Sequence, residues 1–228
     1  MLEGRTVVVT GALGALGSVV ADVAEAAGAK VARLDHAKAS ARRELLFDGL
    51  DLTDEPATTA AMAQIAERCG GIDGLVNIAG GFAWHTLADA PASVWEQMFR
   101  LNLLTAVTAT RAALSALSAG GSGSIVNIGA GAAAKAAAGM GPYTASKAGV
   151  AKLTESLAEE LAGAGVRVNA ILPSTIDTTA NRRDMPSADF STWVQPQDIA
   201  KVIVFLLSDQ SAAITGAQIP VTAGRRGA

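Results

Sequence analysis

Short apolar segments rich in Val, Ile and Leu alternate along the chain with longer, alanine-rich segments of helical composition. The apolar segments predict strands at Thr6–Val9, Lys30–Leu34, Glu44–Phe47, Gly74–Asn77, Ser124–Ile128, Arg167–Ile171 and Gln218–Val221. The longer segments predict helices near Ala15–Ala27, Glu55–Cys69, Ser93–Ala119, Tyr143–Ala162 and Pro196–Ser208. Polar and apolar residues do not alternate strictly within the strands, which is typical of strands that helices cover on both faces. We therefore expect an α/β fold with a doubly wound parallel sheet and right-handed crossovers.

The whole chain, residues 1–228, is expected to form one such domain, because no Pro-, Gly- or Ser-rich linker is long enough to divide it. Gly120–Gly123 predicts a turn from a helix into a strand. The alanine-rich segment Ala130–Ala138 predicts either close packing or a mobile loop.

Composition narrows the partners to small molecules. The 228 residues are 50% hydrophobic and 17% charged with a net charge of -3, and no basic run suggests nucleic acid or an anionic membrane surface. Cys69 is the only cysteine, which excludes a disulfide framework and a CxxC metal site and favours a reducing compartment. The N-terminus leads directly into a strand, so we expect an unprocessed, cytoplasmic protein without a membrane span.

A glycine-rich turn, Thr10-Gly11-Ala-Leu-Gly14-Ala-Leu-Gly17, connects the first predicted strand to the first helix. Glycines there permit a tight turn and let the backbone approach a pyrophosphate, while the start of the helix supplies unpaired N–H groups. The alternative for such a cluster is an ordinary compact turn. Its position between strand and helix favours dinucleotide binding.

Asp35, at the end of the second predicted strand, is placed to accept hydrogen bonds from the adenosine ribose hydroxyls. Its charge repels a 2′-phosphate, which favours NAD(H). NADP(H) stays open if Arg33, Arg42 or Arg43 can reach that phosphate. The alternative for Asp35 is a solvated turn residue.

Tyr143 and Lys147 are four residues apart in a predicted helix, so their side chains share one face. A fixed cation beside a phenol favours the phenolate, and we expect Lys147 to lower the pKa of Tyr143. The pair would then serve as a proton donor or acceptor near neutral pH. Taken alone, the spacing also fits a surface tyrosine beside a solvated lysine.

In chain order the sequence contains Thr10-Gly11-x-x-Gly14-x-x-Gly17, Asp51-Leu52, Asn77-Ile-Ala-Gly80, Asn102, Tyr143-x-x-x-Lys147, Pro173 to Thr178 and Ile214-Thr215-Gly216. In these motifs the chain resembles the short-chain dehydrogenase/reductase family over nearly its whole length. The resemblance implies a Rossmann domain with strand order 3-2-1-4-5-6-7, NAD(P)-dependent oxidoreduction and a homodimer or homotetramer.

The resemblance also implies roles for individual residues. Tyr143 would be the proton donor, Lys147 would hold the nicotinamide ribose and Asn102 would support a water-linked proton relay. The implied cofactor-binding residues are Thr10, Gly11, Leu13, Gly14, Ala15, Leu16, Gly17, Asp35, Asp51, Leu52, Asn77, Ala79, Gly80, Tyr143, Lys147, Pro173, Ser174, Thr175, Ile176 and Thr178. Purely structural alternatives are that Asn77 bridges strands, Asn102 satisfies a helix bulge and Thr178 caps a helix.

The chain departs from the family at one catalytic position. The serine that usually precedes the tyrosine by thirteen residues is replaced by Ala130, and Ser122 and Ser124 are expected to lie too far away to substitute. A lost oxyanion donor can cost on the order of 10²–10³ in rate, which puts ordinary alcohol and ketone chemistry in doubt.

Dihydropteridine reductases resemble this chain at the same position, in the Gly14 to Ser18 turn and in the segment Leu172 to Trp193. A quinonoid pterin is electron-poor and would accept hydride without a serine. We therefore expect a flat, activated acceptor of this kind, with a short lid over residues 179–195. The alternatives are a carbonyl reductase or alcohol dehydrogenase that works slowly without the serine, and a catalytically weak NAD-binding protein.

Aromatic, sulfur-containing and imidazole side chains are candidates for the substrate pocket, although packing is an alternative role for each. They are Phe82, Trp84, His85, Met140, Met185 and Trp193. A metal site is not expected, because His36 is the only other histidine and no clustered ligands accompany either one.

Overall fold

A computed structural model describes residues 1–41 and 43–223. Its strands are β1 (Thr6–Thr10), β2 (Lys30–Asp35), β3 (Leu46–Asp48), β4 (Gly74–Asn77), β5 (Ser124–Ile128), β6 (Arg167–Pro173) and β7 (Gln218–Val221). All are parallel in one sheet of order β3-β2-β1-β4-β5-β6-β7, which confirms the predicted fold.

The helices are α1 (Ala15–Ala26), α2 (Glu55–Cys69), α3 (Ala92–Phe99), α4 (Thr105–Ala119), α5 (Gly141–Leu161), α6 (Thr179–Asp184) and α7 (Pro196–Leu207). A π-helical turn, Arg100–Leu104, joins α3 to α4, and 3₁₀ turns occupy Gly131–Ala133, Ala162–Ala164, Phe190–Thr192 and Asp209–Ser211. One sequence prediction is thereby corrected, because the expected single helix Ser93–Ala119 contains a π-helical insertion. The segment expected to form the lid, residues 179–195, contains the short helix α6.

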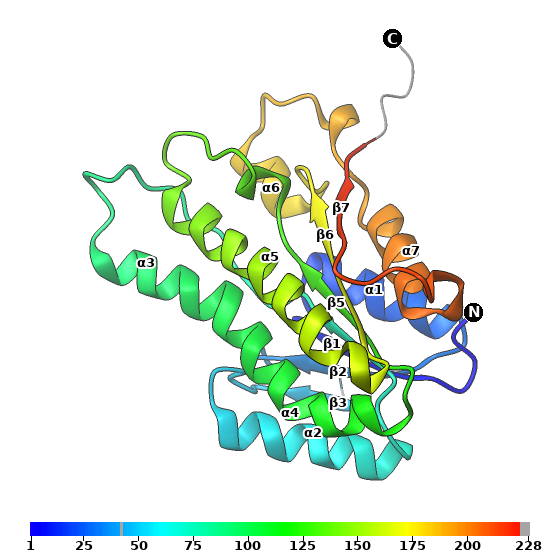
Figure 1. Ribbon diagram of the computed structural model, residues 1–228. Coiled ribbons are helices and arrows are strands. Elements are labelled where there is room, and N and C mark those ends of the chain that lie inside the picture. Colours follow the sequence, from blue (N-terminus) through cyan, green and yellow to red (C-terminus); the bar gives the residue numbers. More distant parts are fainter. Residues whose placement is uncertain (42, 224–228) are drawn as a thin grey trace.

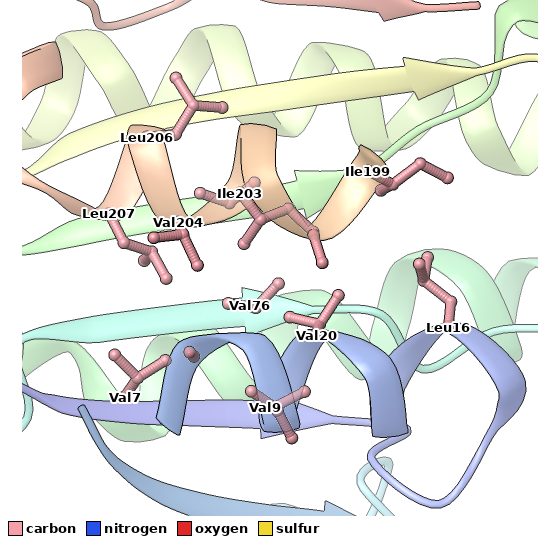
Figure 2. Packing of buried hydrophobic residues seen from close by; sticks show 14 of the residues in the cluster. Val7, Val9, Leu16, Val20, Val76, Ile199, Ile203, Val204, Leu206 and Leu207 are labelled. Atoms are coloured by element: carbon pink, nitrogen blue, oxygen red, sulfur yellow. The ribbon is translucent and has the colours of Figure 1, made fainter. Parts of the chain in front are cut away.

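The sheet buries a different hydrophobic cluster on each face, because successive strand side chains point to opposite sides. Val7 and Val9 pack with residues of α1 and α7, such as Val20 and Ile203, as Figure 2 shows. Val8 between them belongs to the other cluster, which includes residues of α2, α4 and α5. Figure 1 shows α1 and α7 side by side and away from α2, α4 and α5.

Loops at the carboxyl ends of the strands carry most of the residues that the sequence singles out. In Figure 1, α6 lies just beyond the end of β6, near the loop that leads from β5 into α5. In a doubly wound sheet, ligands bind outside these strand ends, where the order of the strands reverses. The reversal here lies between β1 and β4, which are neighbours in the sheet.

Candidate active site

The glycine turn after β1 is too tight for other residues. Gly11 has φ +64, and a Cβ there would lie 2.9 Å from the backbone nitrogen of Ala79. A Cβ at Gly17 would lie only 2.0 Å from the carbonyl oxygen of Gly11. Gly14 precedes α1 and provides no side-chain cap, so the first N–H groups of this helix are left for a ligand such as phosphate.

Thr10 fixes the loop after β4 beside this turn. Its hydroxyl accepts hydrogen bonds from the backbone N–H groups of Ile78, at 3.0 Å, and Ala79, at 3.1 Å. The same hydroxyl donates to the carbonyl oxygen of Val76 at 3.3 Å. Thr10 is buried and therefore acts on the shape of the site, outside the lining of the cleft.

A cleft of about 450 Å³ runs from the glycine turn to Gly80. Its predicted members are Gly11, Leu13, Gly14, Ala15, Leu16, Gly17, Asp35, Asp51, Leu52, Ala79 and Gly80. The other lining residues, which were not singled out from the sequence, are His36, Ala37, Leu50, Thr53, Ile78, Leu101 and Thr105. The volume lies in the usual range for ligand sites, roughly 300–1,000 Å³. The glycine turn gives the cleft walls without side chains, and Asp35 and Asp51 each place a carboxylate near the end of a strand. This combination fits a dinucleotide.

Asp35 holds the glycine turn with one carboxylate oxygen. Its Oδ2 accepts from the backbone N–H of Leu13 and its Oδ1 from that of Ala37, both at 2.8 Å. Each oxygen keeps a lone pair for a ribose hydroxyl. Arg33 cannot serve a 2′-phosphate as the sequence suggested, because it is only 5% exposed and paired with Asp22 and Glu25 of α1.

Arg42, the second candidate for that phosphate, lies outside the described residues. Arg43 is exposed on the loop between β2 and β3.

Asp51 borders both the cleft and an adjoining hollow of about 340 Å³. Its Oδ1 accepts from the backbone N–H and the hydroxyl of Thr53, both at 2.8 Å, and these bonds lower the pKa of Asp51. Arg100 donates to the same hydroxyl at 2.7 Å. Arg100 was not singled out from the sequence, because its reach depends on the π-helical turn that it begins.

Tyr143 and Lys147 lie one turn apart on α5, as their spacing predicts. Lys147 is 6% exposed, and its Nζ donates to the carbonyl oxygen of Ile128 at 2.7 Å. Burial lowers the pKa of Lys147 to about 8, and burial raises the pKa of Tyr143. Burial thus shifts the pKa of Tyr143 in the direction opposite to the one expected from the neighbouring lysine.

Asn102 connects the loop after β4 to α5 from within the π-helical turn. Its Oδ1 accepts from the backbone N–H of Gly81 at 3.0 Å, and its Nδ2 donates to Gly81 O at 3.1 Å and to Ser146 Oγ at 3.0 Å. Ser146 in turn donates to the carbonyl oxygen of Tyr143 at 2.7 Å. Ser146, which was not singled out from the sequence, therefore joins the set of groups around Tyr143.

Gly80 completes this end of the cleft. A Cβ at Gly80 would lie 2.5 Å from Asn102 Oδ1 and 3.6 Å from Lys147 Nζ. Glycine is therefore required for the close approach of the loop to Asn102. The same distances place Lys147 at the Gly80 end of the cleft.

Several predicted cofactor residues have structural partners. Asn77 is buried and donates to Asn127 at 2.9 Å and Thr110 at 3.1 Å, so its side chain bridges β4, β5 and α4. Thr178 caps α6 by accepting from the backbone N–H of Asn181 at 3.1 Å. The segment from Pro173 to Thr178, including Ser174, Thr175 and Ile176, continues from the carboxyl end of β6.

Ala130 is buried at the start of the turn after β5 and brings no hydroxyl to the site. Ser124 begins β5 at the opposite end and donates to Leu206 O at 2.8 Å. Ser122 precedes β5 at that same distant end. Neither serine can replace a donor at position 130.

The lid is anchored at Asp177. Arg182 pairs with this carboxylate, and Gln195 donates to it at 2.8 Å, so the bonds span both ends of the lid. These two partners hold the pKa of Asp177 down to about 2. Within the lid, Trp193 is buried against Phe190, with ring centroids 4.7 Å apart, whereas Met185 is exposed.

The other candidate pocket residues lie on two loops beside Tyr143. Phe82, Trp84 and His85 follow β4, and the Phe82 ring contacts the Tyr143 ring. Met140 immediately precedes α5. In residues 1–41 and 43–223 no three His, Cys, Asp or Glu side chains form a group that could hold a metal ion. No helix within the same described ranges combines the length and hydropathy of a membrane span.

The family model described as short chain dehydrogenase matches residues 5–188. The 2-(S)-hydroxypropyl-CoM dehydrogenase 3 of Xanthobacter autotrophicus is 32% identical over 98% of this chain and 97% of its own length. The galactitol 2-dehydrogenase (L-tagatose-forming) of Cereibacter sphaeroides is 34% identical over 98% of this chain and 95% of its own length.

A solved structure, carveol dehydrogenase from Mycobacterium avium in complex with NAD, superposes with a TM-score of 0.86. The two sequences are 26% identical, and the superposition covers 98% of each chain.

Proposed function

The chain belongs to the short-chain dehydrogenase family and is an NAD(P)-dependent oxidoreductase, and from this premise we propose that it interconverts a secondary alcohol and its ketone with NAD(H) as the preferred cofactor. The observation that carries the proposal is the Tyr143–Lys147 pair on one turn of α5, with Lys147 buried beside Gly80 at one end of a cleft of dinucleotide size. The relatives reported above are named for dehydrogenation of hydroxyl groups.

When bound, the nicotinamide cofactor would supply the hydride for ketone reduction or accept it in alcohol oxidation. Tyr143 would donate the proton to the ketone oxygen, or accept it from the hydroxyl in the reverse direction. Lys147 and Asn102 would support Tyr143 from fixed positions. The bond to the carbonyl oxygen of Ile128 fixes Lys147, and the bond from the backbone N–H of Gly81 fixes Asn102. The glycine turn would bind the pyrophosphate.

Preference for NAD(H) is supported by the charges at the adenosine end. Asp35 presents lone pairs to ribose hydroxyls and repels a 2′-phosphate, while Arg33 is committed to α1. Thus a carboxylate lies at this end, and Arg33 is not available to neutralise it.

The comparisons do not support the resemblance to dihydropteridine reductases, since the relatives reported above are dehydrogenases of other compounds. A flat, electron-poor acceptor nevertheless stays as a second candidate because of one observation. Ala130 leaves the site without the hydroxyl that would polarise a ketone, and an activated acceptor has less need of that donor.

The test compares the two substrate classes in the wild-type chain and in Ala130→Ser. Under the first proposal the wild-type protein oxidises secondary alcohols with NAD⁺, and Ala130→Ser raises kcat/KM on them by up to about 10²–10³, since it adds the missing donor. Under the second, the wild type reduces quinonoid dihydropteridine far faster than any ketone, and Ala130→Ser leaves that rate unchanged.

Ala130→Cys is the matched control, because its thiol is similar in size and donates only weakly. If neither protein converts either class although NADH binds, the catalytic proposal is wrong and a weak NAD-binding protein is favoured.

The proposed enzyme is a cytoplasmic homodimer or homotetramer. Support for self-association comes from the long helices α4 and α5, whose small, alanine-rich faces permit the close approach of a second copy of the chain. Sedimentation at micromolar concentration tests this, and a monomer would contradict it.

A further inference from the structure

The loop after β4 is fastened across the loop that precedes α5. The indole Nε1 of Trp84 donates to the carbonyl oxygen of Ala138 at 3.1 Å, and the backbone N–H of His85 donates to that of Gly139 at 2.8 Å. Gly139 has φ +78, and a Cβ there would lie 2.2 Å from Cε2 of Trp84. The indole thus lies on bare backbone, at a position where only glycine fits.

Phe82, two residues before Trp84, contacts the proton donor directly. Its ring meets the Tyr143 ring edge to face, with centroids 4.9 Å apart and an interplanar angle of 73°. This is a favoured geometry for aromatic pairs. Phe82 restricts the Tyr143 ring, while the bonds from Asn102 to Ser146 and from Ser146 to the Tyr143 carbonyl oxygen hold the Tyr143 backbone.

Both aromatic side chains are otherwise open. Phe82 is 59% exposed and Trp84 is 57% exposed, which is unusual for rings of this size unless a ligand or partner covers them. Phe82 contacts the Tyr143 ring, and Trp84 lies on the loop that leads into α5, so the uncovered apolar surface borders the segment that carries Tyr143.

We infer that Phe82 is a positioning residue for Tyr143 and that, together with Trp84, it forms an apolar wall for the substrate. This inference rests on the proposed function and narrows its substrate class to alcohols and ketones whose carbon skeleton is apolar next to the reacting carbon. A polyol would have to leave hydroxyl groups unpaired against these two rings.

The chain offers a readout that is independent of turnover, because Tyr143 is its only tyrosine. Near-ultraviolet absorbance of tyrosinate during an alkaline titration therefore reports Tyr143 alone. Burial raises the pKa of Tyr143. In Phe82→Leu the loss of the covering ring admits water, so the pKa is expected to fall toward the ordinary value of about 10.

Phe82→Trp keeps an aromatic edge and should restore the wild-type titration. Phe99→Leu is the matched control, since Phe99 is 50% exposed on α3 and has no ring contact with Tyr143 in the described residues. It should leave the titration unchanged. Circular dichroism at each pH establishes that the fold persists over the titration.

Turnover gives the second readout. With an apolar secondary alcohol, Phe82→Leu should lower kcat by about tenfold through misplacement of Tyr143, and the alkaline limb of the pH profile should move with the tyrosinate titration. Trp84→Leu should mainly raise KM for the apolar alcohol, with little effect on a polyol.

The inference is overturned if Phe82→Leu changes neither the titration of Tyr143 nor kcat, or if Phe99→Leu changes them equally. If the wild type converts no alcohol, the proposed function fails, and the substrate wall fails with it, but the tyrosinate titration still decides whether Phe82 positions Tyr143.

Discussion

At the glycine-turn end of the cleft the site consists mainly of backbone, whereas at the Tyr143 end it consists of side chains from separate segments. Gly11 and Gly17 leave no room for a Cβ, and local hydrogen bonds fix the turn around them. Tyr143, Asn102 and Phe82 come from α5, the π-helical turn and the loop after β4, and they meet only in the folded chain.

This difference indicates how each end can change during evolution. A turn that depends on absent side chains tolerates few substitutions, so binding of a dinucleotide is retained or lost as a unit. A set of side chains on different loops can lose one member, such as the hydroxyl at position 130, while the others persist.

Tyr143→Phe should have the largest effect and should separate the two ends completely. Removal of the phenolic oxygen removes the proposed proton donor, so kcat should fall by about 10²–10⁴, the usual contribution of general acid–base catalysis. The Kd for NADH should change little, because the glycine turn holds the pyrophosphate. Stopped-flow hydride transfer and fluorescence titration with NADH measure the two quantities.

Lys147→Ala is the comparison variant for this experiment and should weaken both turnover and NADH binding, since Lys147 lies at the Gly80 end of the cleft. Wild-type turnover by Tyr143→Phe, with chemistry as the slow step, would show that another group donates the proton.

The same difference explains what could be predicted from the sequence. The glycine turn and the Tyr143–Lys147 spacing follow from local patterns, the strand order follows from the family resemblance, and the structure places all three as expected. The roles of Arg100 and Ser146 could not be predicted, because each depends on the π-helical insertion at Arg100–Leu104. A helix bulge at Asn102 was one alternative from the sequence, but no local motif fixes where the extra backbone group enters the helix or which side chains it brings together.

The electrostatic environment of individual side chains could not be predicted from the sequence either. The spacing of Tyr143 and Lys147 was right, but the inferred direction of the pKa of Tyr143 was wrong, since burial raises it and leaves Lys147 bonded to Ile128. The sequence likewise left Arg33 free to reach a phosphate, whereas in the fold it is buried on β2 and paired with Asp22 and Glu25 of α1. Burial is a property of the tertiary structure and cannot be read from neighbours in the chain.

Asp35→Ser should have an intermediate effect, confined to the glycine-turn end. Loss of the carboxylate removes the repulsion of a 2′-phosphate, so the ratio of the Kd values for NADPH and NADH should fall by about tenfold, or about 1.4 kcal/mol. Titration of both cofactors at fixed ionic strength measures the ratio.

Asp35→Asn is the control that separates charge from turn geometry, because its amide oxygen can still accept from Leu13 or Ala37. Asp35→Asn should lower the ratio of the Kd values for NADPH and NADH nearly as much as Asp35→Ser does. Tighter binding of NADPH by the wild-type protein would reverse the argument for NAD(H).

Asp177→Asn should have the smallest effect, because it acts on the lid, outside both ends of the cleft. The amide keeps the size of the side chain and loses the ion pair with Arg182, so backbone amides of the lid should exchange hydrogen faster while those of the core are unaffected.

The folded pKa of Asp177, about 2, lies below its ordinary value of 3.8. Its stabilising contribution is therefore complete above the ordinary value and is lost only as the pH falls through the folded one. Wild-type lid protection, corrected for intrinsic exchange, should thus be the same at about pH 6 and about pH 8. A change between these pH values, or unaltered lid protection in Asp177→Asn, would show that other contacts hold the lid.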